Sequence, residues 1–173
     1  DGAPSCCINT ICSHTNGIVT GGNDGRILMF THQLELVYEF SLKRQHISHF
    51  DSILPQITSV SMPHSNNSKI PSEHLLIATK SSEAYYIDLI RAKEQNIVKP
   101  VRVQQGSFGS RSEMWGVACH PTNPNIIVTC GDDRTVRSYD TSTHNVISRT
   151  RVEFKARCVN FSPDGQHLGI GLI

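Results

Sequence analysis

A single pattern of strands and turns recurs four times along the chain, and this repetition limits the fold more than any other feature. Each unit contains an apolar strand, a polar turn, a second apolar strand, an acidic turn and a third strand that ends in an aromatic or apolar residue. The strands are short, and their β-branched residues favour a sheet. The third unit shows the pattern in full, at residues 117–121, 126–133 and 136–140.

The turns between these strands contain residues that favour tight chain reversals. In residues 162–165, Ser-Pro-Asp-Gly, proline fixes φ at the first central position and glycine accepts a positive φ. Residues 23–25, Asn-Asp-Gly, offer the same chemistry in the first unit. Both segments therefore predict hairpins between consecutive strands.

Repeats of roughly 40–50 residues with four short strands are typical of β-propeller blades. We therefore predict an all-β fold, a propeller fragment of about three and a half four-stranded blades with incomplete closure. Because closed propellers need about four to eight blades, we expect the chain to be part of a longer protein. The expected blades span about residues 6–40, 56–103, 114–152 and, in part, 156–173, with outer strands at 34–40, 98–103 and 146–152.

Several segments interrupt the repeat and are expected to be loops. No apolar period of 3.6 residues is long enough to predict a substantial helix. The insertions are polar by composition, and loops on a rigid scaffold commonly carry recognition. They lie at residues 41–55, 66–72 and 104–112.

Charge and hydropathy exclude two classes of protein. Lys+Arg is 16 and Asp+Glu is 15, a net charge of +1, which argues against a dedicated nucleic-acid binder. No apolar run approaches about eighteen residues, so no membrane span is expected. No signal peptide is visible.

Six cysteines and nine histidines give no sign of a metal site or a nucleophile. No Cys-x-x-Cys pair occurs, and most cysteines lie in apolar runs, so we expect buried, reduced thiols, as in the cytosol. His46 and His49 have no further ligand at metal spacing and are expected to be solvated loop residues. We therefore predict no catalytic, cofactor-binding or metal-binding residues and no cofactor.

The repeated units resemble WD40 repeats. Asp24 and Asp133 stand where WD repeats place their turn aspartate, and Tyr139-Asp140 occupies the Trp-Asp position. Residues 161–165, Phe-Ser-Pro-Asp-Gly, are similar to the turn between the first two strands of a repeat. No unit keeps the Trp of that pair or has the Gly-His pair, so the family's Asp-His-Ser-Trp hydrogen-bond tetrad is not reproduced in sequence.

The third unit resembles a narrower family, the echinoderm microtubule-associated protein-like proteins. The similarity rests on residues 113–121, Glu-Met-Trp-Gly-Val-Ala-Cys-His-Pro, and on Thr-Cys-Gly-Asp-Asp at 129–133. It implies propellers in tandem, binding to tubulin or microtubules, and a cytoplasmic location on the microtubule cytoskeleton. The family's N-terminal coiled coil is absent from this sequence, which sustains no apolar heptad. The residues taken as structural motif are Trp115, Gly116, His120, Pro121, Asp133, Tyr139, Asp140, Asp164 and Gly165.

Six basic residues form the candidate partner-binding set. Within residues 134–157 only Asp140 and Glu153 are acidic, so the local formal charge is +4. Arg149 and Arg151 are expected on one strand face, and a basic patch could steer the encounter with the acidic surfaces and tails of tubulin. The alternative is an outer strand whose charges prevent pairing with other sheets. The six residues are Arg134, Arg137, Arg149, Arg151, Lys155 and Arg157.

Trp115, the single tryptophan, has two interpretations. It could anchor an interface, because tryptophan is enriched at binding hot spots. Its position at the start of an inner strand favours packing in the core. Gly116 is expected to permit close approach of a neighbouring backbone.

The sequence thus favours a non-enzymatic propeller region that binds tubulin or microtubules, with neither nucleic acid nor membrane as partner. A general WD40 scaffold that assembles other proteins without contacting tubulin is the second reading. An enzyme with a site at the central channel is the third, and only analogy of fold supports it.

Overall fold

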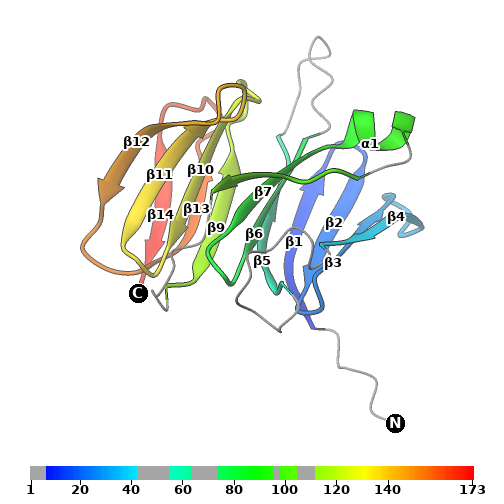
Figure 1. Cartoon of the computed structure of the whole chain (residues 1–173), viewed down its shortest axis with the longest axis horizontal. Coiled ribbons are helices and arrows are strands. Elements are labelled where there is room, and N and C mark those ends of the chain that lie inside the picture. Colours follow the sequence, from blue (N-terminus) through cyan, green and yellow to red (C-terminus); the bar gives the residue numbers. More distant parts are fainter. Residues whose placement is uncertain (1–6, 43–54, 64–73, 96–97, 105–111) are drawn as a thin grey trace.

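The computed structural model of the chain describes residues 7–42, 55–63, 74–95, 98–104 and 112–173. These residues form antiparallel sheets that follow one another in chain order (Figure 1). Three sheets have four strands and the last has two, and no sheet closes on another. The predicted all-β, incomplete propeller is therefore confirmed.

The strands of each sheet are consecutive in sequence, as in a meander. The first sheet contains β1 (Ile8–His14), β2 (Gly17–Gly22), β3 (Arg26–Phe30) and β4 (Leu36–Ser41). The second contains β5 (Ile57–Ser61), β6 (His74–Thr79), β7 (Ala84–Asp88) and β8 (Val101–Gln104). The third contains β9 (Met114–Cys119), β10 (Ile126–Gly131), β11 (Thr135–Asp140) and β12 (Asn145–Arg151). The fourth contains β13 (Ala156–Phe161) and β14 (Leu168–Leu172).

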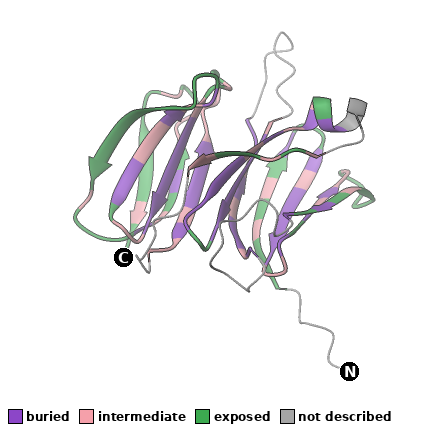
Figure 2. Ribbon diagram, viewed as in Figure 1, coloured by how far each residue is buried: buried purple, intermediate pink, exposed green. Residues whose placement is uncertain are grey.

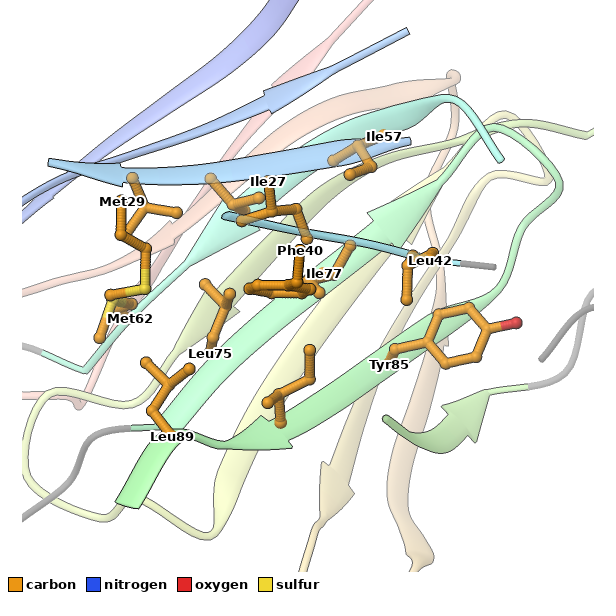
Figure 3. Packing of buried hydrophobic residues seen from close by; sticks show 13 residues of the cluster. Ile27, Met29, Phe40, Leu42, Ile57, Met62, Leu75, Ile77, Tyr85 and Leu89 are labelled. Atoms are coloured by element: carbon orange, nitrogen blue, oxygen red, sulfur yellow. The ribbon is translucent and has the colours of Figure 1, made fainter. Parts of the chain in front are cut away.

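The first strands of the four sheets line the inner side of the arc, because β1 packs on β5, β5 on β9 and β9 on β13. Many residues of the strands are buried, shown in purple in Figure 2, and most of these buried residues are apolar. One cluster lies between the first two sheets and includes Ile27, Leu75 and Ile77, all fully buried (Figure 3). Two smaller clusters join the second sheet to the third and the third to the fourth.

The turn between the second and third strands has the same backbone form in the first three sheets. Gly25, Ser82 and Arg134 occupy equivalent positions with φ of 74°, 65° and 59°. In each turn the N–H of this residue donates to the carbonyl three residues earlier, at 3.0–3.2 Å. The repeat seen in the sequence is therefore a repeat of backbone geometry, although only the first turn has glycine there.

A short helix, α1 (Leu89–Gln95), connects β7 to β8. Leu89 and Ala92 are buried and lie on one helix face, whereas Arg91 is exposed. The sequence analysis predicted no substantial helix, and this one spans only seven residues. Two turns are too short for an apolar period to be recognised.

The outer strands differ by a few residues from those expected. Leu34 has φ 65° and its N–H donates to the carbonyl of Thr31, so it belongs to the turn before β4 rather than to the strand. The expected insertions lie largely, and His46 and His49 entirely, outside the described residues. Cys6 lies outside them as well.

The last sheet leaves part of its apolar surface uncovered. Leu168, Ile170 and Leu172 of β14 are 39%, 36% and 44% exposed. These side chains are therefore only partly covered by the described part of the chain.

Candidate protein-interaction surface

The hairpin of β11 and β12 places most of the basic candidates at the outer border of the third sheet. Asp140 begins the connecting turn, where its carboxylate accepts hydrogen bonds from the N–H groups of Ser142, at 2.8 Å, and Thr143. Hydrogen bonds from the Ser142 side chain and backbone hold the pKa of Asp140 below its usual value. The local chemistry of this turn therefore directs β12 back along β11.

Three arginines share one face of this hairpin. Arg149 of β12 lies opposite Arg137 of β11, and Arg151 lies opposite Thr135. The Arg137 guanidinium forms an ion pair with Asp133 and is largely buried. Arg149 and Arg151 are exposed and have no ion-pair partner among the described residues. The two outer arginines are therefore available to a partner.

Arg134 lies apart from this face, at the tip of the turn between β10 and β11. Its side chain is exposed and no described acid pairs with it, while its carbonyl accepts a hydrogen bond from the N–H of Val152 at 2.8 Å. Its left-handed backbone is uncommon for a residue with a side chain. Arg134 is thus a third cation free for binding.

Lys155 and Arg157 both form ion pairs with Asp132. The ammonium of Lys155 lies 3.3 Å and the guanidinium of Arg157 3.2 Å from the same carboxylate oxygen, and the Asp132 side chain is only 8% exposed. Asp132 and Asp133 precede the segment in which charges were counted. The local charge of +4 therefore overstates the free positive charge, because the fold brings these two acids onto three of the six basic residues.

Trp115 lies half-buried beneath the guanidinium of Arg157, which is 4.3 Å from the ring centroid. The indole Nε1 is buried without a hydrogen-bond partner in the described part of the chain. The cation–π contact with Arg157 is therefore the polar interaction that the Trp115 ring makes. Trp115 thus packs within the seam between the third and fourth sheets. Beside it, a side chain at Gly116 would collide with Cys130 and the backbone of Val159, which confirms the predicted close approach.

His120 joins the third sheet to the fourth. Its Nδ1 accepts hydrogen bonds from the N–H groups of Thr122 and Asn123, and its Nε2 donates to the carbonyl of Gly165 at 3.1 Å. The ring packs edge-on against Phe161 with centroids 4.8 Å apart. Gly165 has φ 75° and leaves no room for a side chain beside the imidazole. Two motif residues far apart in sequence thus make one contact.

The turn aspartates accept hydrogen bonds from residues of their own turns. Asp133 accepts hydrogen bonds from the N–H and the hydroxyl of Thr135, and Asp24 accepts one from the N–H of Arg26. Burial alone would raise the pKa of Asp133, but hydrogen bonds from Arg137 and Thr135 outweigh it and hold the pKa below its usual value. In the fourth sheet, hydrogen bonds from Ser162 and Gln166 lower the pKa of Asp164. These acids act locally to shape turns.

Gln104, Tyr139 and Thr129 form a hydrogen-bonded triad that the sequence analysis did not identify. Gln104, at the end of β8, accepts hydrogen bonds from the hydroxyls of Tyr139 at 2.5 Å and Thr129 at 2.9 Å. Tyr139 is 4% exposed and fills the position of the WD40 tryptophan. The amide therefore ties the outer strand of the second sheet to the third.

Glu83 was also overlooked, and it is 1% exposed. Its carboxylate accepts a hydrogen bond from the Tyr85 hydroxyl at 3.0 Å and pairs with the Arg102 guanidinium at 3.3 Å. Burial and the Glu83 charge raise the pKa of Tyr85 far above its usual value. An acidic residue just before an aromatic strand is too common a pattern to reveal such a buried pair.

The described cysteines range from buried Cys130 through half-buried Cys12 and Cys119 to exposed Cys7 and Cys158. Burial raises the pKa of Cys119 and Cys130 to about 12 and also raises that of Cys12, so these thiols are poor nucleophiles. Cys7 and Cys158 are exposed, contrary to the expectation of general burial. Cys158 is exposed because it lies on the two-stranded sheet, whose outer face no described sheet covers.

A cavity of about 840 Å³ lies along the inner strands of the four sheets. Its lining combines hydroxyl and apolar side chains and includes Thr10, Ser59, Pro121 and Asn160. The described residues contain no group of three or more His, Cys, Asp or Glu side chains that could hold a metal ion. No described helix is long and apolar enough to cross a membrane.

Comparison with known proteins agrees with this geometry. The family described as WD domain, G-beta repeat matches residues 99–140, which contain β8 to β11. One repeat therefore joins the outer strand of one sheet to the inner three of the next, where Gln104 makes its bonds. The fold is consistent with an incomplete WD40-type β-propeller, and residues 99–140 match one WD40 repeat.

The most informative relatives are echinoderm microtubule-associated protein-like proteins, as the resemblance predicted. Echinoderm microtubule-associated protein-like 4 of Mus musculus is 26% identical over 164 residues, which cover 94% of this chain and 14% of that protein. Echinoderm microtubule-associated protein-like 2 of Mus musculus is 35% identical over 65 residues, which cover 38% of this chain and 10% of that protein. Echinoderm microtubule-associated protein-like 4 of Homo sapiens is 23% identical over 165 residues, which cover 94% of this chain and 14% of that protein. The chain thus spans about a seventh of the length of these relatives or less.

Proposed function

We propose that this chain is a non-enzymatic protein-interaction region that binds tubulin or microtubules and helps to organise the microtubule cytoskeleton in the cytoplasm. The relatives are named as microtubule-associated. The observation that carries the proposal is the exposed, unpaired arginine pair of β12, Arg149 and Arg151. Arg134 adds a third free cation at the neighbouring turn.

The physical basis is electrostatic attraction to an acidic protein surface. Unpaired charges steer the approach of an oppositely charged partner and fix its orientation. The same attraction is screened by salt, because the Debye length falls from about 10 Å at 0.1 M to about 3 Å at 1 M. Binding that depends on Arg149 and Arg151 should therefore weaken as salt is raised.

A general WD40 scaffold without tubulin contact is the second candidate. It is favoured by the internal pairing of Arg137, Lys155 and Arg157, which removes half of the expected basic patch. Charges on an outer strand also have an ordinary role in preventing pairing between sheets.

Microtubule co-sedimentation and soluble-tubulin pull-down test the proposal, with the complete protein at low and high salt. We expect Arg149→Glu/Arg151→Glu to weaken binding about tenfold or more at low salt, because two attractive charges become repulsive. The substituted strand keeps charged side chains, so its protection against sheet pairing is retained. Loss of tubulin binding therefore cannot be attributed to aggregation of an unprotected edge.

The matched control is Arg91→Glu/Lys99→Glu, which changes the net charge equally at exposed positions of α1 and of the segment before β8. It should bind within about twofold of the unaltered protein if recognition is local to β12. Equal losses in both variants would show non-specific attraction. Unaltered binding by the β12 variant, or no binding by the folded complete protein, would favour the general scaffold.

A further inference from the structure

Strand β12 differs from the other outer strands in its exposure. It forms one border of the third sheet, and no described strand pairs with its outer side (Figure 1). All seven of its residues are exposed, whereas β4 buries Phe40 and β8 has only four residues. It contains no proline, so its main-chain donors are intact. The strand therefore presents an open edge.

The direction of the main-chain groups in β12 follows from its pairing with β11. The N–H of Val152 donates inward, to the carbonyl of Arg134. Since antiparallel strands alternate, the main-chain groups of Thr150 and Ser148 also point inward. Those of Arg149 and Arg151 therefore point outward, so the residues with the free charges also carry the free hydrogen-bonding groups.

The usable part of this edge is short and well defined. A register shift between Ser138 and Tyr139 bulges the beginning of β12, whereas residues 148–151 pair regularly with β11. Within these four residues, the side chains of Arg149 and Arg151 lie two positions apart on one face. An added strand would place its own alternate side chains opposite them, at the same spacing of about 7 Å.

We propose that residues 148–151 bind an extended acidic protein segment as an added antiparallel strand. The main chain of the segment pairs with Arg149 and Arg151, and carboxylates at every second position face their guanidinium groups. The inference deepens the proposed function, on which the identification of tubulin as the source of the segment rests. The alternative role of the arginines, protection of the edge, predicts that no strand is added.

The test uses a fluorescent ten-residue peptide of alternating Glu and Thr, with anisotropy measured against the complete protein. Two N-methylated forms have equal charge and composition. Methylation of the Glu nitrogens removes the N–H groups that face β12 in the antiparallel arrangement, whereas methylation of the Thr nitrogens removes those that face away. We expect the first form to bind at least about tenfold more weakly and the second within about twofold of the unmethylated peptide.

Equal affinity of the three peptides would overturn strand addition, and the reverse pattern would overturn the antiparallel pairing. Arg149→Glu/Arg151→Glu should abolish peptide binding, whereas Arg91→Glu/Lys99→Glu should not. The outcome is separable from the proposed function. Peptide binding without tubulin binding would refute tubulin as the partner and leave the edge site, whereas tubulin binding with equal peptide affinities would do the opposite.

Discussion

At the scale of single residues, the turns show how far an internal repeat tolerates local strain. Gly25, Ser82 and Arg134 adopt the same left-handed backbone, which is free of steric cost only for glycine. The surrounding hairpin imposes the conformation in the second and third sheets. The strain is therefore a property of the sheet geometry rather than of the residue chosen.

Arg134→Gly should raise the free energy of unfolding of the complete protein by about 0.5–1 kcal/mol, because glycine relieves the strained backbone. The gain is limited by the greater freedom of glycine in the unfolded chain. Denaturant unfolding measures it. Gly25→Ala is the mirror control and should lower stability, so a loss of stability in both variants would contradict the explanation.

Asp133 should make the stability of the third sheet depend on pH. Its pKa is lowered in the folded state, so its contribution is fully present above the unfolded pKa of about 4 and is lost as pH falls through the folded pKa. Asp133→Asn should cost about 1–2 kcal/mol at pH 7 and flatten the decline below pH 4. Unfolding measured between pH 2 and 7 checks this, and an unchanged slope would contradict it.

At the scale of elements, side chains from one sheet support the next. Gln104 of β8 binds Tyr139 and Thr129 of the third sheet, and His120 binds the turn between β13 and β14. Each bond joins residues that no local rule pairs. The expected blade bounds themselves stay predictions.

Tyr139→Phe should lower the free energy of unfolding by about 1 kcal/mol, because it removes the hydroxyl that donates to the Gln104 amide oxygen. Thr129→Val removes the second bond to the same amide. In a double-mutant cycle the two effects should be coupled by at least about 0.5 kcal/mol. Strict additivity would show that the triad does not act as a unit.

Gly165→Ala should weaken the attachment of the fourth sheet by about 2 kcal/mol or more. Alanine is strained at φ 75° and its methyl group would displace the His120 ring. Hydrogen exchange should quicken in β13 and β14 and stay unchanged in β1 to β4. Uniform loss of protection across all sheets would instead indicate global destabilisation.

At the scale of the whole molecule, apolar side chains are exposed on both the first and the fourth sheet. Ile11 of β1 is 67% exposed, and Ile170 is 36% exposed on β14, the border strand of the two-stranded sheet. Exposed apolar surface of this kind promotes association. The buried apolar clusters lie between neighbouring sheets rather than at a single centre, as in other repeat proteins.

Residues 1–173 in isolation should associate as concentration rises. Ile11→Lys/Ile170→Lys should reduce this association, because it replaces an exposed apolar side chain with a charge on both the first and the fourth sheet. Sedimentation velocity measures it, with Val146→Lys as a control at an exposed apolar residue on the outer hairpin. A sharp, cooperative unfolding of a monomeric isolated chain would contradict the expectation.

The sequence alone determined the repeat, the order of the strands and the chemistry of the turns, because these depend on residues within a few positions of one another. Gly165 and Asp133 show this, since their roles follow from the turn residues beside them. Only the tertiary structure decided which cations are free. Asp132 and Arg157 are distant in sequence, and packing of the third sheet on the fourth brings their charges together, while Arg149 and Arg151 lie on a strand that nothing covers.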